Sequence, residues 1–183
     1  MEVRSLAIPD IKLIAPRRFA DERGYFEQTY QRRDYLAAGI DAEFVQDNHS
    51  KSSRGVLRGL HYQHQHPQAK LVSVLAGSVF DVAVDLRRSS AYFGQWVGAE
   101  LSAENGHQLY IPPGFAHGFL VQSEEVNFYY KCDAYYAPGD EYCIRWDDPE
   151  LGIVWPLVCE PSLSTKDQAG VPLAQMPVEK LFA

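Results

Sequence analysis

Short apolar runs broken by turn residues fill most of the chain from Phe44 onward. This pattern is typical of an all-β sandwich or barrel, not of alternating helices and strands. Residues 79–86 show the clearest period, because an apolar face alternates with a mixed face that carries Asp81 and Asp85. Gly77-Ser78 separates this segment from another apolar run, and a glycine-first two-residue loop suits a type II′ turn. We therefore predict one β-hairpin over residues 70–86.

The same alternation of apolar runs and turn residues predicts the remaining strands, turns and helix. Further strands are expected at residues 6–14, 24–30, 92–101, 108–111, 116–122, 126–135 and 142–146. The charged segment 17–23 is expected to be a solvated loop, and Pro112-Pro113-Gly114 a tight turn. One helix is predicted from Arg32 to Gly39, with the glycine as its C-terminal cap. An irregular tail begins near residue 148.

The composition indicates one globular domain over residues 1–183. The 183 residues are 46% hydrophobic and 22% charged, which is enough apolar content for a sizeable core. The net charge of -7 argues against a general affinity for nucleic acid or for an anionic membrane. Any anionic ligand must therefore be held by local cations.

The N-terminal segment and the cysteines indicate in which cellular compartment the protein is expected. The segment MEVRSLAIPDIKLI has no continuous apolar run, so we expect neither a signal peptide nor a spanning helix, and a cytoplasmic protein. Cys132, Cys143 and Cys159 are odd in number and lack a CxxC spacing, which argues against a disulfide framework or a zinc knuckle. We interpret them as buried thiols.

Two spacings resemble the motifs of the cupin superfamily. Gly106, Pro112, Gly114 and His117 fit the second motif, and His64, His66 and Gly77 nearly fit the first. However, Lys70 stands where metal-binding cupins have glutamate, and a protonated lysine cannot ligate a divalent ion. A cluster of His64, His66 and His117 could still hold a transition metal, because imidazole is a ligand for several such ions. However, His64 and His66 lie in a polar, proline-containing connection, where exposed loop histidines are more common than metal ligands. We therefore expect an all-β, cupin-like jelly-roll barrel or sandwich with a few short helices and without a metal.

The remaining polar residues suit proton transfer. The sequence contains no G-x-S-x-G elbow, no Walker loop and no G-x-G-x-x-G fingerprint. A histidine such as His61, a cation such as Lys70 and a tyrosine from the pair at 129–130 could together move protons beside a carbonyl. In such chemistry the histidine removes a proton, the cation stabilises the enolate oxygen and the phenol returns a proton.

Long ordered motifs then resemble one enzyme family over nearly the whole chain. They are RGYF at 23–26, FVQDNHS at 44–50, GVLRGLHYQ at 55–63, QAKLV at 68–72, DVAVDLR at 81–87, IPPGFAHGF at 111–119, YYK at 129–131 and WDDPELGIVWP at 146–156. These segments resemble the dTDP-4-dehydrorhamnose 3,5-epimerases. The resemblance implies epimerisation at C3 and C5 of dTDP-4-dehydro-6-deoxy-D-glucose, in dTDP-L-rhamnose biosynthesis, with no cofactor.

The resemblance also assigns roles to four residues. It implies that His61 is the base, that Asp167 orients it and that Tyr130 is the opposing acid. Lys70 would lie near the C4 oxygen of the sugar, where negative charge develops. Tyr129 and Tyr130 have opposite strand parity, so only one of them can point inward, and only the family motif selects Tyr130.

Further positions match residues that bind the nucleotide and the sugar in the family. They are Arg23, Gln46, Asn48, Arg58, His117, Tyr136, Glu141 and Lys166. Gln28 stands where the family has glutamate, so a charged ligand contact there is replaced by a neutral one or shifted. Arg58 and His61 are three residues apart, so a common pocket requires a bend or a bulge in the strand, which we place at Gly59.

Three alternatives remain open from the sequence. A related epimerase could act at C3 alone or at C5 alone with the same residues. A metal-dependent cupin oxygenase would require a bound transition metal, and a sugar-nucleotide binding module would have no chemistry at His61. The family resemblance further implies a homodimer, with the N-terminal strands exchanged between subunits.

Overall fold

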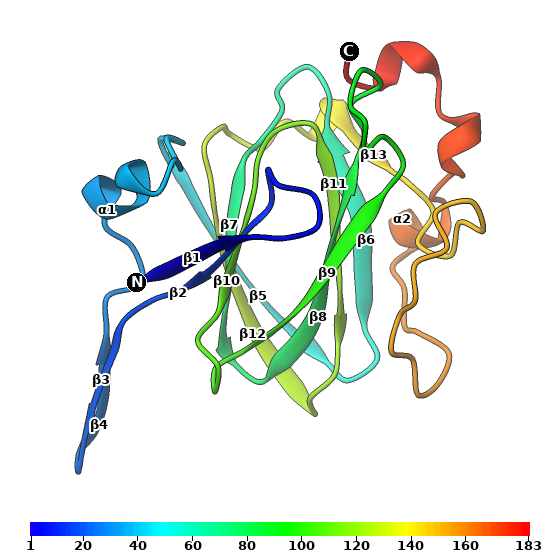
Figure 1. The fold of residues 1–183 in the computed structure, drawn as a ribbon. Helices are drawn as coiled ribbons and strands as arrows, with labels where there is room; N and C mark the ends of the chain where they lie inside the picture. The colour runs from blue at the N-terminus through cyan, green and yellow to red at the C-terminus, as the bar shows by residue number, and fades with distance from the viewer.

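The computed structural model describes residues 1–183 as two antiparallel β-sheets packed face to face (Figure 1). The six-stranded sheet has the order β1 (Glu2–Ser5), β2 (Lys12–Ala15), β10 (Gln108–Ile111), β7 (Lys70–Ala76), β12 (Glu125–Cys132) and β5 (Gln46–Ser53). The five-stranded sheet has the order β13 (Glu141–Cys143), β6 (Leu57–Gln63), β11 (Phe115–Val121), β8 (Ser78–Asp85) and β9 (Trp96–Ser102). The two sheets do not close into a barrel, and the predicted all-β, cupin-like sandwich is confirmed.

The core between the sheets follows the two-residue period of the strands. Inward side chains of both sheets form its main cluster, for example Val72 from β7, Ala83 from β8 and Phe128 from β12. The outer face of the five-stranded sheet is also apolar, and Val82 and Val84 of β8 pack there under the C-terminal segment. Burial on both faces explains why β8 contains so few exposed positions.

The predicted hairpin over residues 70–86 is wrong. The two strands exist as β7 and β8, but they belong to different sheets: β7 pairs with β10 and β12, and β8 pairs with β9 and β11. Gly77, with φ +81°, turns the chain from one sheet to the other. A Cβ at this position would lie 2.1 Å from the Glu125 carbonyl oxygen, so the crossing requires glycine.

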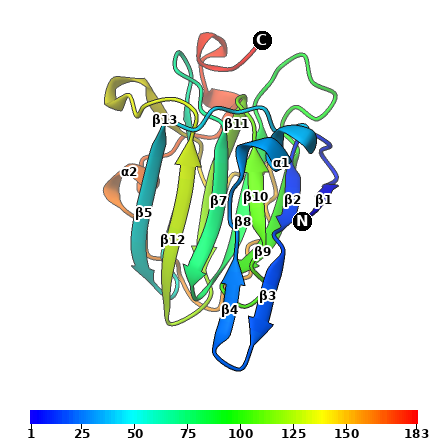
Figure 2. The same cartoon turned by 90° about the vertical axis from the view of Figure 1, so that its left-hand side faces the viewer.

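The N-terminal region also differs from the prediction. The segment 6–14 is interrupted by a turn that closes with a hydrogen bond from the Ile11 N–H to the Ile8 carbonyl, and both isoleucines are buried. The charged segment 17–23 is not a loop, because β3 (Arg18–Asp21) pairs there with β4 (Gly24–Glu27). Figure 2 shows this hairpin extending beyond the edge of the six-stranded sheet.

The helices are short. α1 (Arg32–Ala37) ends as predicted, because the Gly39 N–H donates to the Leu36 carbonyl and the Ile40 N–H to the Tyr35 carbonyl, which is a Schellman motif. α2 (Thr165–Gln168) and the 3₁₀ turns η1 (Pro138–Asp140), η2 (Leu173–Gln175) and η3 (Val178–Lys180) lie in or near the C-terminal segment. None of the helices is long and apolar enough to cross a membrane.

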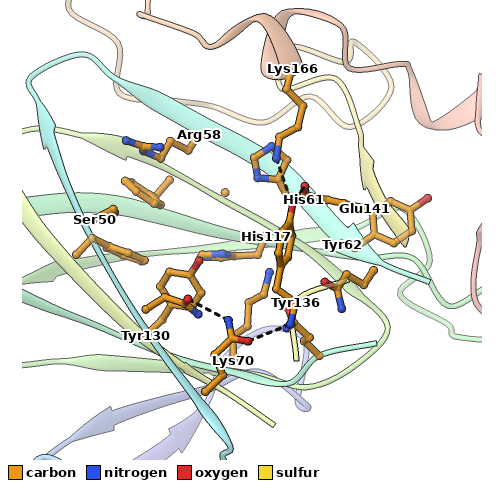
Figure 3. A pocket seen from close by; sticks show the side chains of 17 residues that line it. Ser50, Arg58, His61, Tyr62, Lys70, His117, Tyr130, Tyr136, Glu141 and Lys166 are labelled. Atoms are coloured by element: carbon orange, nitrogen blue, oxygen red, sulfur yellow. Dashed lines mark hydrogen bonds and ion pairs between the residues drawn. The ribbon is translucent and has the colours of Figure 1, made fainter. Parts of the chain in front are cut away.

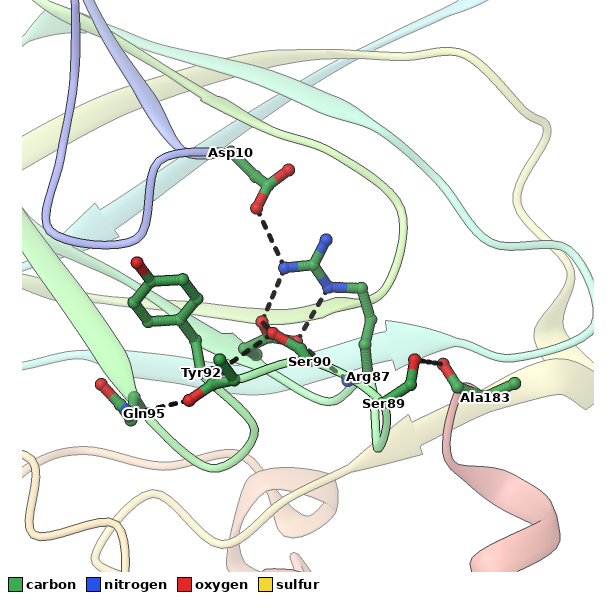
Figure 4. A network of polar contacts seen from close by, with 9 residues as sticks. Asp10, Arg87, Ser89, Ser90, Tyr92, Gln95 and Ala183 are labelled. Carbon is green, nitrogen blue, oxygen red and sulfur yellow. Dashed lines mark hydrogen bonds and ion pairs between the residues drawn. The ribbon is translucent and has the colours of Figure 1, made fainter.

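Polar contacts fix the connection between β8 and β9 (Figure 4). The buried Asp85 carboxylate accepts hydrogen bonds from the Arg87 guanidinium at 2.6 and 3.0 Å and from the Ser90 hydroxyl at 2.7 Å. Arg87 also reaches Asp10 in the N-terminal turn at 3.1 Å. These contacts tie the N-terminal turn to the end of the sandwich that lies away from the β3–β4 hairpin.

Candidate active site

One cavity of about 390 Å³ lies between the two sheets, beside strands β5, β6 and β12. Successive side chains of a strand point to opposite faces of the sheet, and this alternation determines which polar side chains reach the cavity. Lys70 shares the inward face of β7 with Val72 and Val74, and Tyr130 shares that of β12 with Phe128. His117 enters from the inward face of β11, in the opposite sheet. Tyr129 points to the outer side of its sheet, so the choice of Tyr130 agrees with the geometry.

A bulge in β6 brings Arg58 and His61 into the same cavity (Figure 3). Against β11, His61 pairs with His117 and Arg58 pairs with Phe119, so three steps on β6 oppose two on the neighbouring strand. A Cβ at Gly59 would lie 2.6 Å from the Gly118 Cα and from the His117 carbonyl oxygen. The predicted bulge at Gly59 is therefore confirmed.

His61 contacts a buried carboxylate from the C-terminal segment. Its Nε2 lies 2.6 Å from Asp167 Oδ1, and the Asp167 side chain is 3% exposed. The same carboxylate accepts hydrogen bonds from the Ser164 hydroxyl at 2.6 Å and from the Gly59 N–H at 3.1 Å. Burial raises the pKa of Asp167, but these three partners outweigh it and lower the pKa to about 2. The carboxylate is thus ionised behind the imidazole ring.

The groups across the cavity from His61 are a phenol and an amine. Burial, with smaller contributions from Cys132 and Glu141, raises the pKa of Tyr130 to about 12, so its hydroxyl is protonated at neutral pH. Burial lowers the pKa of Lys70, against the opposing effect of nearby acidic groups. Protonated tyrosine and an amine of reduced basicity are both suited to give protons to a substrate.

The structure adds Asp81, which the sequence reasoning did not select. Asp81 is fully buried on the inward face of β8, and its oxygens lie 2.9 and 3.0 Å from His117 Nε2. Burial raises the pKa of Asp81, although His117 and Lys70 oppose this. The alternation of Asp81 with apolar residues was visible in the sequence and was the signal that could have identified it.

Polar side chains of β5 line the wall next to Tyr130. Gln46, Asn48 and Ser50 alternate on one face of this strand, and Ser52 continues the row and accepts hydrogen bonds from Arg58 at 2.9 and 3.1 Å. Ser50 was missed because the polar segment 46–53 was not recognised as a strand. Once β5 is known, the period of two identifies it.

A second set of side chains surrounds the mouth of the cavity. The Tyr136 hydroxyl donates to Glu141 at 2.9 Å, and Glu141 also pairs with Lys166 at 2.8 Å. Tyr136 is half exposed, so one face of its ring is available for stacking. Together with Arg58, the Lys166 ammonium places positive charge beside the opening, as an anionic ligand requires.

Arg23 and Gln28 do not reach this cavity. Arg23 lies at the tip of the β3–β4 hairpin, where its side chain is 83% exposed and its guanidinium pairs with Asp21 at 2.6 Å. Gln28 is exposed just after β4. The other predicted site residues either line the cavity or, like Asp167, support a residue that does.

The histidines of the first cupin-like spacing also lie apart from the cavity. His64 and His66 are in the connection after β6, and His64 Nε2 lies 3.1 Å from the Leu181 carbonyl oxygen. His117, by contrast, is buried against Asp81.

Of the three cysteines, Cys132 is buried as predicted, Cys143 is partly buried, and Cys159 is exposed, so the prediction of a buried thiol is wrong for Cys159.

The fold and the cavity together define a cupin-like sugar isomerase. The family model described as dTDP-4-dehydrorhamnose 3,5-epimerase matches residues 5–175. The dTDP-4-dehydrorhamnose 3,5-epimerase of Pseudomonas aeruginosa is 57% identical over 171 residues, which cover 93% of this chain and 94% of that protein. The chain belongs to the dTDP-4-dehydrorhamnose 3,5-epimerase family.

Solved structures agree with this assignment. The dTDP-6-deoxy-D-glucose-3,5-epimerase of Legionella pneumophila, in complex with dTDP-4-keto-L-rhamnose, superimposes with a TM-score of 0.97 at 51% identity, covering 99% of this chain and 97% of that one. A 3′-monoepimerase from Streptomyces bikiniensis, in complex with dTDP-quinovose, has a TM-score of 0.87 at 33% identity, covering 93% and 87%. Enzymes that act at one carbon therefore share the fold.

Proposed function

We propose that this chain is a dTDP-4-dehydrorhamnose 3,5-epimerase that converts dTDP-4-dehydro-6-deoxy-D-glucose into dTDP-4-dehydro-L-rhamnose. The observation that carries the proposal is the His61–Asp167 contact on one side of a cavity that has Tyr130 and Lys70 on the other. Family membership at 57% identity to a named epimerase supports the double reaction over the single one.

The proposed reaction begins with proton removal at the carbon next to the ketone. His61 Nε2 is directed to Asp167, so Nδ1 is the nitrogen that takes the proton from C3 or C5. The ionised Asp167 then stabilises the imidazolium that forms. Lys70 stabilises the charge that develops on the C4 oxygen, and Tyr130 returns a proton from the opposite face, which inverts the carbon. The ketone of the substrate supplies the acidity, so the proposal includes no cofactor.

The nucleotide end of the substrate would bind at the mouth of the cavity. Arg58 and Lys166 supply the cations that a pyrophosphate needs on a chain of net charge -7. The exposed ring of Tyr136 would stack on the thymine. Gln46 and Asn48 offer amide groups to the sugar and the nucleotide, and His117 and Glu141 complete the pocket.

We also propose a homodimer in which the β3–β4 hairpin reaches the partner's cavity. The exposure of Arg23 and Gln28, away from the cavity of their own chain, supports this arrangement. Phe19, Tyr25 and Phe26 on the hairpin are between 49% and 68% exposed, which suits a surface that another chain covers. One domain over residues 1–183 and a cytoplasmic location stay predictions.

Turnover in heavy water tests the reaction. The wild-type chain should incorporate deuterium at both C3 and C5 of the sugar, as NMR of the product detects. His61→Asn should slow the incorporation by about 100-fold or more, since a positioned base contributes about 10²–10⁴-fold. Incorporation at one carbon alone would identify a single epimerase. Unchanged incorporation in His61→Asn would remove His61 from the role of base.

A further inference from the structure

A third side chain lies against the His61–Asp167 pair and has no part in the proposed reaction. In the pairing of β13 with β6, Cys143 lies directly opposite His61. Directly opposed residues project from the same face of a sheet, with their Cβ atoms about 4.5–5.5 Å apart. The register alone therefore brings a thiol beside the imidazole, on the strand that also carries Glu141 into the cavity.

The three groups converge within the range of one metal ion. The ligating atoms of His61, Cys143 and Asp167 all lie within 4.8 Å of one another. They come from three separate elements, β6, β13 and α2. A tetrahedral zinc site holds its nitrogen, sulfur and oxygen ligands at about 2.0–2.3 Å from the ion, so small side-chain movements would bring these atoms to coordination distance.

The imidazole nitrogen in this group lacks a well-aligned partner. His61 Nε2 is sealed from solvent, and its 2.6 Å contact with Asp167 does not have the alignment of a hydrogen bond. A buried nitrogen without an aligned partner is a costly feature in a folded protein. Coordination of a cation between Nε2, the thiolate and the carboxylate would give this nitrogen a partner.

We propose that His61, Cys143 and Asp167 form an inhibitory site for a thiophilic divalent cation, with Zn²⁺ as the fitting ion. Thiolate and imidazole ligands favour Zn²⁺, whereas Mg²⁺ prefers oxygen ligands. On binding, the Cys143 thiol proton and any proton on His61 Nε2 leave to solvent. The fourth position of the ion is filled by water.

The site inactivates the base without filling the substrate cavity. An imidazole that is coordinated through Nε2 keeps its proton on Nδ1, so it cannot accept one from the sugar. Asp167 at the same time loses its free negative charge to the ion. The kcat should therefore fall while the affinity for dTDP stays unchanged. This inhibition rests on the proposed role of His61, but binding of the ion does not.

The binding arm of the test uses Co²⁺ as a spectroscopic substitute for Zn²⁺. Wild-type protein should show a thiolate-to-cobalt charge-transfer band in the near ultraviolet with one Co²⁺ per chain, and added Zn²⁺ should abolish it. Cys143→Ala should lack the band. Cys159→Ala, which removes the exposed thiol, should keep it and serves as the matched control. A band of equal strength in Cys143→Ala, or no band in the wild type, would overturn the proposed site.

The activity arm measures deuterium incorporation against free Zn²⁺. Inhibition should be complete in the wild type, reversed by EDTA and not reproduced by Mg²⁺. Cys143→Ala should incorporate deuterium normally without metal and need at least tenfold more Zn²⁺ for half inhibition. Equal sensitivity of Cys143→Ala and wild type would contradict the site. Cobalt binding with unaltered activity would contradict the role of His61 instead, so the two proposals fail separately. Circular dichroism of each variant checks its fold.

Discussion

At the scale of single residues, the surroundings of each ionisable group decide what it can do. His61, Tyr130 and Lys70 are common residue types, and the groups packed around each of them set its role. Burial raises the pKa of Tyr130 and lowers that of Lys70, while three partners lower the pKa of Asp167 and keep its carboxylate ionised. The arrangement separates His61, the proposed base, on the five-stranded sheet from Tyr130, the proposed acid, and Lys70 on the six-stranded sheet.

The low pKa of Asp167 predicts a specific acid sensitivity of the fold. The pKa falls from an ordinary 3.8 to about 2 in the folded chain, so the stabilisation is present above pH 4 and is lost as the pH falls through 2. A shift of this size corresponds to about 2 kcal/mol. The difference in unfolding free energy between wild type and Asp167→Asn should therefore shrink by about 2 kcal/mol between pH 5 and pH 2. Urea unfolding at each pH measures it, and a constant difference would show that Asp167 has no lowered pKa.

At the scale of elements, the bulge in β6 positions His61, the proposed base. Leu57, Leu60 and Tyr62 point to the outer core of the five-stranded sheet, while Arg58 and His61 point to the cavity. A regular strand would place Arg58 and His61 on opposite faces. The bulge therefore delivers two polar side chains to the cavity from one strand and keeps the outer face of that strand apolar.

Substitution at the bulge tests this element. Gly59 has φ +117°, and an added Cβ would lie 2.6 Å from backbone atoms of β11. We expect Gly59→Ala to cost at least about 3 kcal/mol of unfolding free energy and to abolish deuterium incorporation. Gly139→Ala is the matched control, because nothing lies within 4 Å of its added Cβ. Wild-type stability and activity in Gly59→Ala would show that the bulge does not require glycine.

At the scale of the whole molecule, the β3–β4 hairpin is held firmly but points away from its own cavity. Arg18 pairs with Glu27 across the hairpin at 3.3 Å and attaches it to the sandwich through the Glu104 and Ala103 carbonyls at 2.9 and 3.1 Å. Its exposed aromatic rings and Arg23 remain free of such contacts with the sandwich. A hairpin that is attached firmly to the sandwich and exposes aromatic rings at its free end supports the proposed exchange between two chains.

Mixing two inactive variants tests the exchange. If Arg23 acts in the partner's cavity, a heterodimer of Arg23→Ala and His61→Asn contains one cavity with both wild-type residues. Refolding equal amounts together should then restore about a quarter of the wild-type activity, because half of the dimers are mixed and each has one intact cavity. Light scattering should give twice the mass of one chain. A monomer, or no restoration from a mixture shown to contain heterodimers, would contradict the exchange.

The strand-rich class, most strand positions, the C-terminal cap of α1 and the need for a bulge at Gly59 could all be predicted from the sequence. These features depend on side-chain period and on local backbone requirements, which neighbouring residues specify. The long motifs further identified the family and, through it, His61, Tyr130 and Lys70 as partners in one pocket.

The pairing of the strands could not be predicted and became known from the three-dimensional structure. A turn such as Gly77-Ser78 has the same sequence signature in a hairpin and in a crossing between two sheets. Which of the two forms depends on the pairing of β7 and β8 with β9, β10, β11 and β12, which are distant in the sequence. The same long-range pairing placed Asp81 behind His117 and Cys143 opposite His61. Local periodicity fixes the face on which a side chain lies, but only the register between strands fixes its neighbours.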